Sequence, residues 1–232
     1  VIITGCTSGI GYETAIEFSK KNTKIALISK SIVKLENLKN ELRNYSTNRI
    51  EIFAIDLTDI IKVSHLIKKV ESKFNQKTDI LINCAGYATL GDIIDIPINS
   101  FSKNLDINFF VPLILSKSVI ENMKKNNFGQ IIFINSGSSK RGLPGSSSYC
   151  ISKSALSIFV ESLRVELYKY NIDIISVLPG LVDTNIRKNS EVFGKIKFDF
   201  TERKSISAKI VAKKIVEGSI LRKNYIIISF KT

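Results

Sequence analysis

Short apolar stretches alternate with longer amphipathic stretches from one end of the chain to the other. The apolar stretches are rich in β-branched residues and carry almost no polar position, as in Ile25 to Ile28 and Ile131 to Ile134. Runs of this kind are typical of strands that helices cover on both faces of a sheet. They predict strands near residues 1–4, 24–29, 50–55, 79–83, 130–135, 173–178 and 225–229, with helices between them.

This alternation predicts an α/β fold, a single-domain, Rossmann-like, doubly wound parallel sheet of about seven strands with helices on both faces. No linker or repeat divides residues 1–232. Ser31 and Ser207 stand directly before helical apolar patterns, so we expect both to cap helices. Residues 185–205 follow neither period, and we expect them to act as a substrate flap over a site.

The chain of 232 residues is basic, with 34 Lys and Arg against 21 Asp and Glu and a formal net charge of +13. Such a charge could serve nucleic acid or an anionic membrane surface. The lysines are instead spread over most predicted helices, as in the pairs Lys20-Lys21 and Lys68-Lys69, which is typical of solvated faces. The sequence therefore predicts no nucleic-acid partner.

The sequence contains no stretch near the roughly 18 consecutive apolar residues that a membrane-spanning helix needs. Cys6, Cys84 and Cys150 lie far apart, without Cys-x-x-Cys spacing and with only His65 as an imidazole partner, so they indicate neither a disulfide framework nor a metal site. We expect reduced thiols and a cytoplasmic location. Because the chain begins at Val1, a membrane-associated location follows instead if a trimmed terminus carried an anchor.

A glycine-rich turn follows the first predicted strand and leads directly into a helix. Glycines let the backbone turn tightly and approach a pyrophosphate, whose charge the free amides at the start of a helix can bind. The turn therefore predicts a dinucleotide-binding site, although an ordinary strand-to-helix turn can look alike. Its candidate contacts are Thr4, Gly5, Thr7, Ser8, Gly9, Ile10 and Gly11.

The end of the second predicted strand indicates which dinucleotide binds. An acidic residue there would accept hydrogen bonds from a ribose 2′-hydroxyl and repel a 2′-phosphate, whereas a basic residue does the reverse. The chain has Ser29, Lys30 and Ser31 at this place and no carboxylate. NADP(H) is therefore favoured over NAD(H), with Ser29 and Lys30 as contacts, unless Lys30 is one more surface lysine.

Tyr149 and Lys153 carry the candidate chemistry. Four positions apart on a predicted helix, they share one face, so the ammonium can reach toward the phenol. A nearby cation stabilises the phenolate and lowers the tyrosine pKa from its ordinary value of about 10, which suits proton transfer near neutral pH. Ser136 stands thirteen positions before Tyr149.

The spacing Thr-Gly-x-x-x-Gly-x-Gly in residues 4–11 resembles the short-chain dehydrogenase/reductase family. Three further segments resemble the family's motifs in the expected order: Asp56-Leu57, residues 83–86 with Cys84 in place of an asparagine, and residues 179–184. The resemblance covers essentially the whole chain. The cofactor contacts that it implies are Asp56, Leu57, Asn83, Ala85, Gly86, Tyr149, Lys153, Pro179, Gly180, Val182 and Thr184.

By this resemblance, Tyr149 is the general acid in reduction and the base in oxidation, and Lys153 lowers its pKa while holding the nicotinamide ribose. Asn108 matches the family asparagine that shapes a helix kink and holds a water for proton relay, unless it is a buried capping amide. Ser136 would hold the substrate oxygen, and the thirteen-residue spacing favours it. The polar neighbours that compete for this role are Asn135, Ser138 and Ser139.

The sequence indicates the substrate less clearly than the cofactor or the reaction. Phe193, Phe198 and Phe200 lie among basic residues, which suits an apolar substrate with an anionic end, or simply a solvated loop. The end of the chain lacks the Asp-Gly-Gly element of carrier reductases and of the common tetramers, and it resembles the branch with 3-ketodihydrosphingosine reductases and hydroxysteroid dehydrogenases. We therefore expect an NADP(H)-dependent oxidoreductase that reduces a lipophilic ketone or oxidises the matching secondary alcohol.

The family resemblance also implies a homodimer or homotetramer, and it leaves a membrane surface open as a further partner. Two other functions stay open. One is reduction of a 3-oxoacyl thioester on an acyl carrier. The other is a non-catalytic NADP(H)-binding sensor, a class that typically lacks the tyrosine or lysine that this chain retains.

Overall fold

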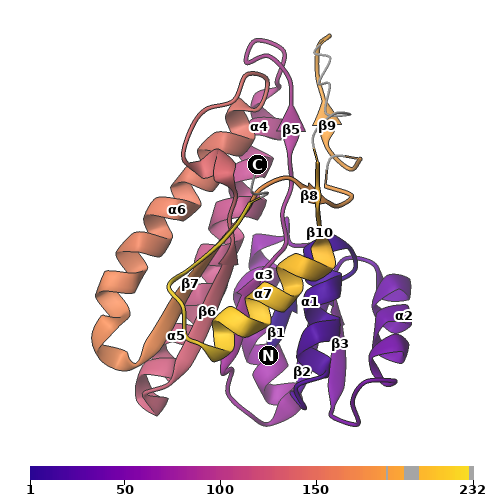
Figure 1. Cartoon of the computed structure of the whole chain (residues 1–232), viewed down its shortest axis with the longest axis vertical. Coiled ribbons are helices and arrows are strands. Elements are labelled where there is room, and N and C mark those ends of the chain that lie inside the picture. Colours follow the sequence, from indigo (N-terminus) through magenta and orange to yellow (C-terminus); the bar gives the residue numbers. More distant parts are fainter. Residues whose placement is uncertain (187, 196–203, 230–232) are drawn as a thin grey trace.

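The computed structural model describes residues 1–186, 188–195 and 204–229. A parallel sheet of seven strands forms its centre, in the order β11-β7-β6-β4-β1-β2-β3 (Figure 1). The predicted doubly wound sheet is confirmed, with each strand within two residues of its expected position. The strands are β1 (Ile2–Thr4), β2 (Ile25–Ser29), β3 (Ile50–Ala54), β4 (Ile80–Asn83), β6 (Gly129–Ile134), β7 (Ile172–Pro179) and β11 (Tyr225–Ile228).

Helices cover both faces of the sheet. On one face lie α1 (Gly9–Ser19), α2 (Ile32–Leu42) and α7 (Ala208–Ile220), and on the other α3 (Ile60–Phe74), α5 (Val111–Asn126) and α6 (Ser147–Leu167). The remaining helical elements are α4 (Ile98–Leu105), the π-helix η1 (Asp106–Phe110) and the 3-10 turns η2 (Gly137–Ser139) and η3 (Tyr168–Tyr170).

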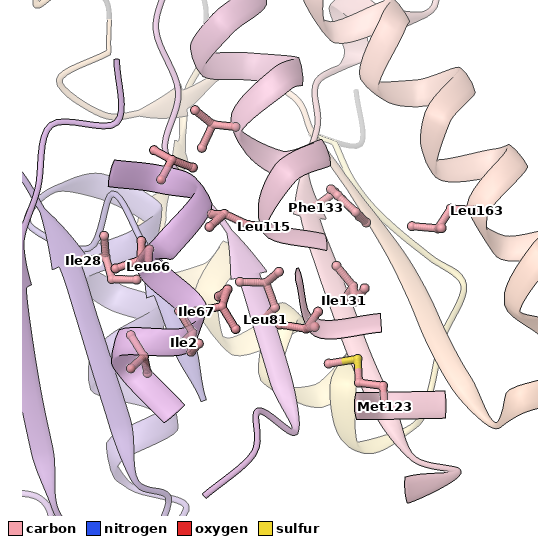
Figure 2. Packing of buried hydrophobic residues seen from close by; sticks show 14 of the residues in the cluster. Ile2, Ile28, Leu66, Ile67, Leu81, Leu115, Met123, Ile131, Phe133 and Leu163 are labelled. Atoms are coloured by element: carbon pink, nitrogen blue, oxygen red, sulfur yellow. The ribbon is translucent and has the colours of Figure 1, made fainter. Parts of the chain in front are cut away.

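The strands are apolar throughout because each one contributes to two cores. In β6, Ile131 and Phe133 pack against α3, α5 and α6, as Figure 2 shows, whereas Ile132 and Ile134 point to the opposite core beneath α1 and α7. Ile131, Ile132 and Phe133 are completely buried. Burial of each such side chain contributes about 1.5–3 kcal/mol, so the two cores hold the sheet's carboxyl edge in a fixed place.

Both predicted helix caps are present. The Ser31 hydroxyl accepts a hydrogen bond from the Lys34 amide, and the Ser207 hydroxyl accepts one from the Ile210 amide. Each bond satisfies one of the amides that the first helical turn leaves without a backbone partner. α2 and α7 therefore begin where the serines predict.

The sequence pattern did not predict four strands of two residues each. They are β5 (Thr89–Leu90), β8 (Val182–Asp183), β9 (Glu191–Val192) and β10 (Ile206–Ser207). β5 pairs with β9 and β8 with β10. Two residues are too few to show an alternation. The expected flap at 185–205 thus contains a strand, while Phe198 and Phe200 lie outside the described residues.

None of the helices in the described part of the chain is both long enough and apolar enough to cross a membrane.

Candidate active site

A cleft opens at the carboxyl ends of the central strands. The chain order reverses between β1 and β4, and in doubly wound sheets ligands bind outside the strand ends at such a point. The cavity here has a volume of about 1100 Å³. It runs from the glycine-rich turn after β1, past the ends of β2 and β3, to the loops after β4, β6 and β7, so residues far apart in sequence share one wall.

The glycine-rich turn needs its glycines for close approach. Gly5 has a φ of +64°, and a Cβ there would lie 2.7 Å from the Cα of Ala85. A Cβ on Gly11 would lie 2.4 Å from the carbonyl oxygen of Gly5. Because these neighbours are backbone atoms, they cannot move aside as a side chain can. Any larger residue would push the turn away from the loop after β4.

The start of α1 suits an anion. Ser8 occupies the N-cap position but makes no side-chain capping bond, so its hydroxyl leaves the first amides of the helix uncovered. Gly9, Ile10 and Gly11 line the cleft at this place. Free amides and the positive end of the helix dipole attract a phosphate. The turn and the helix start therefore fit a pyrophosphate.

Polar and basic side chains follow at the end of β2. The hydroxyls of Thr7 and Ser29 lie 2.8 Å apart and join the glycine-rich turn to this strand. Ser29 and Lys30 line the cleft, and so does Lys34 from the first turn of α2. The sequence interpretation missed Lys34, although its position four residues after Lys30 was a usable signal. No carboxylate stands at the end of this strand.

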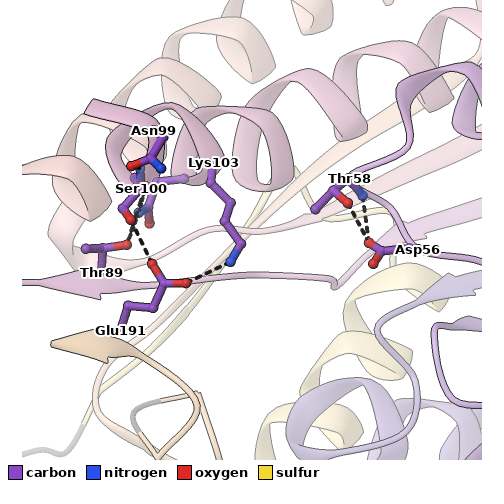
Figure 3. Close-up of polar contacts among 8 residues, drawn as sticks. Asp56, Thr58, Thr89, Asn99, Ser100, Lys103 and Glu191 are labelled. Atoms are coloured by element: carbon purple, nitrogen blue, oxygen red, sulfur yellow. Dashed lines mark hydrogen bonds and ion pairs between the residues drawn. The ribbon is translucent and has the colours of Figure 1, made fainter. Parts of the chain in front are cut away.

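Asp56 lies across the cleft, after β3. Its carboxylate accepts hydrogen bonds from the amide and the hydroxyl of Thr58, both at 2.9 Å (Figure 3). The hydrogen bond from the Thr58 amide is the largest cause that lowers the pKa of Asp56, and the charge of Lys30 lowers it by a smaller amount. Asp56 therefore stays ionised with one oxygen engaged, and Leu57 beside it offers an apolar wall for a flat base.

Tyr149 and Lys153 stand on one face of α6 and both line the cleft. The Lys153 ammonium lies 5.9 Å from the centre of the Tyr149 ring and donates a hydrogen bond of 2.9 Å to the carbonyl of Ile134. Lys153 is only 4% exposed. Burial lowers its pKa to about 8, because the charged form loses its water.

Ser136 lies at the end of β6 and caps η2, where its hydroxyl oxygen accepts a hydrogen bond of 3.1 Å from the Ser138 amide. Ser136 lines the cleft, and so do Asn135 and Ser138. Ser139 is buried and donates to the Ser136 carbonyl instead. Of the competing side chains that the sequence left open, the structure thus brings Asn135 and Ser138 to the cavity wall and keeps Ser139 away from it.

Asn108 does not line the cleft. It is fully buried in η1, and its amide nitrogen donates to the Tyr87 carbonyl at 2.8 Å and to the Ser152 hydroxyl at 2.9 Å. Its side-chain oxygen accepts from the Tyr87 amide at 2.9 Å. Ser152 in turn donates to the carbonyl of Tyr149. Asn108 therefore ties the loop after β4 to the helix that carries Tyr149, from within the π-helical segment η1.

Two predicted cofactor residues also lie behind the wall. The Thr4 hydroxyl accepts hydrogen bonds from the amides of Cys84 and Ala85 at 3.0 and 3.1 Å, and the side-chain amide of Asn83 is buried with no hydrogen-bond partner among the described residues. Both can shape the cleft without touching a ligand. The predicted residues that line it are Gly5, Thr7, Ser8, Gly9, Ile10, Gly11, Ser29, Lys30, Asp56, Leu57, Ala85, Gly86, Ser136, Tyr149, Lys153, Pro179, Gly180, Val182 and Thr184.

The cleft is also lined by residues that no motif indicated. Half of them are apolar and half are polar or charged. They come from four separate parts of the chain, so no local pattern could have grouped them. They are Leu90, Lys103, Ile107, Arg141, Leu143, Ile186, Asn189 and Ser190.

Comparison with known proteins decides the family. The model of the short chain dehydrogenases matches residues 1–193. The chain belongs to the short-chain dehydrogenase family. The resemblance inferred from the motifs is confirmed, and the family is one of oxidoreductases that use nicotinamide cofactors.

Two relatives of this short-chain dehydrogenase are informative. Dehydrogenase/reductase SDR family member 7B of Xenopus tropicalis is 34% identical over 195 residues, which are 82% of this chain and 63% of the relative. The 3-ketodihydrosphingosine reductase of Dictyostelium discoideum is 36% identical over 241 residues, 94% of this chain and 71% of the relative. The chain therefore spans less than two thirds of the frog protein.

Solved structures agree on the fold. A short-chain dehydrogenase from Sphingobium yanoikuyae in complex with NADPH has a TM-score of 0.88 at 24% identity, over 98% of this chain and 86% of that one. The bulky-bulky ketone specific alcohol dehydrogenase of Comamonas testosteroni has a TM-score of 0.85 at 20% identity, over 100% and 86%. Similarity at this level of identity establishes the architecture alone.

Proposed function

We propose that this short-chain dehydrogenase reduces a lipophilic ketone with NADPH, or oxidises the matching secondary alcohol with NADP⁺. One observation carries the proposal: Ser136, Tyr149 and Lys153 line the same cleft as the glycine-rich turn. A nicotinamide dinucleotide supplies or removes the hydride when it is bound. The protein must then hold the substrate oxygen and move one proton.

Tyr149 is the proton donor in reduction, and Lys153 makes that role feasible. A phenol with a pKa of about 10 donates poorly near neutrality, and bringing its pKa to the working pH takes about 4 kcal/mol. Since burial lowers the pKa of Lys153 to about 8, this side chain is still mostly an ammonium at pH 7 and can stabilise the phenolate. The Ser136 hydroxyl, fixed at the start of η2, holds the substrate oxygen.

The preference for NADP(H) rests on charge. Ser29, Lys30 and Lys34 line the cleft where the adenosine ribose would lie, and no acidic residue ends β2. A 2′-phosphate would find two ammonium groups and a hydroxyl there, whereas NAD(H) would find no carboxylate for its 2′-hydroxyl.

A lipophilic ketone suits the far end of the cleft. Leu90, Ile107, Leu143 and Ile186 line the same cleft as Tyr149 and give it apolar surface. The name of the Dictyostelium relative, 3-ketodihydrosphingosine reductase, points to the same substrate class. Arg141 also lines the cleft. Its guanidinium could bind the phosphate on the carrier arm of an acyl thioester, so such a thioester is the second candidate substrate.

The test is binding followed by turnover. NADPH fluorescence is titrated with protein, and NADPH oxidation is then followed with a sphingoid ketone, a steroid ketone and a 3-oxoacyl thioester. We expect turnover of a lipophilic ketone. Tyr149→Phe should lower kcat at least about 100-fold, the contribution of a positioned general acid, and leave NADPH affinity within a few-fold. Binding without turnover of any ketone would favour a sensor, and an active Tyr149→Phe variant would reject the proton-transfer role.

A further inference from the structure

Residues 188–195, the outer segment, are docked onto the body of the protein at the far end of the cleft. β9 in this segment pairs in parallel with β5, Glu191 opposite Thr89 and Val192 opposite Leu90. The Phe193 amide extends the pairing with a hydrogen bond of 2.8 Å to the Leu90 carbonyl. A strand pair of two residues is too short to hold a segment by backbone bonds alone.

Glu191 adds side-chain contacts to this short pairing. One carboxylate oxygen lies 2.8 Å from the Lys103 ammonium, and the other accepts a hydrogen bond of 2.9 Å from the Ser100 hydroxyl (Figure 3). Both partners stand on α4. The bond from Lys103 is the largest cause that lowers the pKa of Glu191 to about 2, so the carboxylate is charged at any working pH.

Lys103 also contacts the loop that carries Tyr87. Its ammonium lies 4.3 Å from the centre of the Tyr87 ring, a cation-π distance. The backbone of Tyr87 is bonded on both sides to the Asn108 amide, which reaches α6 through Ser152. A continuous set of contacts therefore runs from the outer segment to the helix of the proton donor.

The outer segment forms a wall of the cleft next to Glu191. Asn189 and Ser190, which directly precede it, line the cavity, and Lys103 and Tyr87 line it from the body of the protein. Glu191 itself is not part of the lining. This position indicates that Glu191 shapes the cleft through the residues around it and does not contact a ligand.

We propose that Glu191 is a positioning residue of the proposed reaction: its contacts with Lys103 and Ser100 hold the outer segment as the wall of the ketone-binding end of the cleft. The inference rests on the proposed function. Lys30 and Lys34, the proposed contacts of the 2′-phosphate, follow β2, and Glu191 does not line the cleft, so reversing the charge of Glu191 should weaken the ketone and change the Kd of NADPH little.

Charge reversal tests the contact. Glu191→Lys places two ammonium groups together on residues that are about 40% exposed, and we expect the KM of the ketone to rise about 5- to 10-fold, with kcat and the Kd of NADPH within about 2-fold. Hydrogen exchange of the Phe193 amide, measured without any substrate, should become faster by a similar factor. The double variant Glu191→Lys with Lys103→Glu restores opposite charges, so the exchange of the Phe193 amide should return to within about 2-fold of the parent.

The matched control is Glu121→Lys, which reverses the exposed pair of Glu121 with Lys125 on α5, away from the cleft. It should change neither the KM nor the exchange of Phe193. Unchanged exchange in Glu191→Lys would overturn the proposal, and so would faster exchange with an unchanged KM or no recovery of the exchange rate in the double variant. If the parent protein reduces no ketone, the proposed function fails and the positioning role with it, while the exchange data separately decide whether the ion pair holds the segment.

Discussion

Lys153 is a buried cation, and its replacement by methionine should change stability in a pH-dependent way. A fall of the lysine pKa from 10.5 to about 8 corresponds to about 3 kcal/mol against the folded state with a charged side chain. Methionine has a similar length and no charge. At pH 7 the variant Lys153→Met is free of this cost, although it also loses the hydrogen bond to the Ile134 carbonyl.

The direction follows from proton counts. Between about pH 8 and 10.5 the unfolded chain holds a proton on Lys153 that the folded protein has released, so the free energy of unfolding contributed by this group rises with pH. The cost is fully present below about pH 8 and absent above 10.5. The stability of Lys153→Met relative to the parent should therefore be greater at pH 7 than at pH 10 by about 2–3 kcal/mol.

Urea unfolding of the parent and of Lys153→Met at pH 7 and at pH 10 measures how their difference in free energy of unfolding changes with pH. The lost Ile134 bond enters equally at both pH values, and the other titrating groups are common to both proteins, so these contributions largely cancel. Lys125→Met, at an exposed site, gives the background of removing one lysine. A relative stability of Lys153→Met that does not change between pH 7 and 10 would refute the buried-cation reasoning, and we expect no ketone turnover from this variant at either pH.

Two further predictions concern the cofactor end of the cleft. Gly11→Ala should destabilise the fold by about 1–3 kcal/mol and weaken NADPH binding, because its Cβ would lie 2.4 Å from the Gly5 carbonyl oxygen. In the control Gly142→Ala, the added Cβ has nothing within 4 Å, so the free energy of unfolding in urea should change by less than about 0.5 kcal/mol. Equal effects of the two substitutions would contradict the close-approach argument. Lys30→Ala and Lys34→Ala should each weaken NADPH about 5- to 10-fold and NADH less than 2-fold in fluorescence titrations; equal losses for both dinucleotides would remove the 2′-phosphate contact.

The positions of the seven strands were determined by the sequence alone, because strands buried on both faces must be apolar at nearly every position. Ser31 and Ser207 marked two helix starts for an equally local reason, since a cap bonds to amides within three residues. The turn at residues 4–11 and the spacing of Tyr149 and Lys153 indicated the family for the same reason: each requirement is met within one turn and one helix.

Other features were decided only by the tertiary structure. Whether a residue at a strand end reaches the cleft depends on neighbours from distant segments, so Thr4, Asn83 and Asn108 lie behind the wall while Lys34 lines it. β5 and β9 have no pattern of their own, and they pair only because segments far apart in the sequence meet, as Lys103 and Glu191 do across 88 positions. The pKa of Lys153 likewise depends on how much water the folded core excludes, which no local pattern contains.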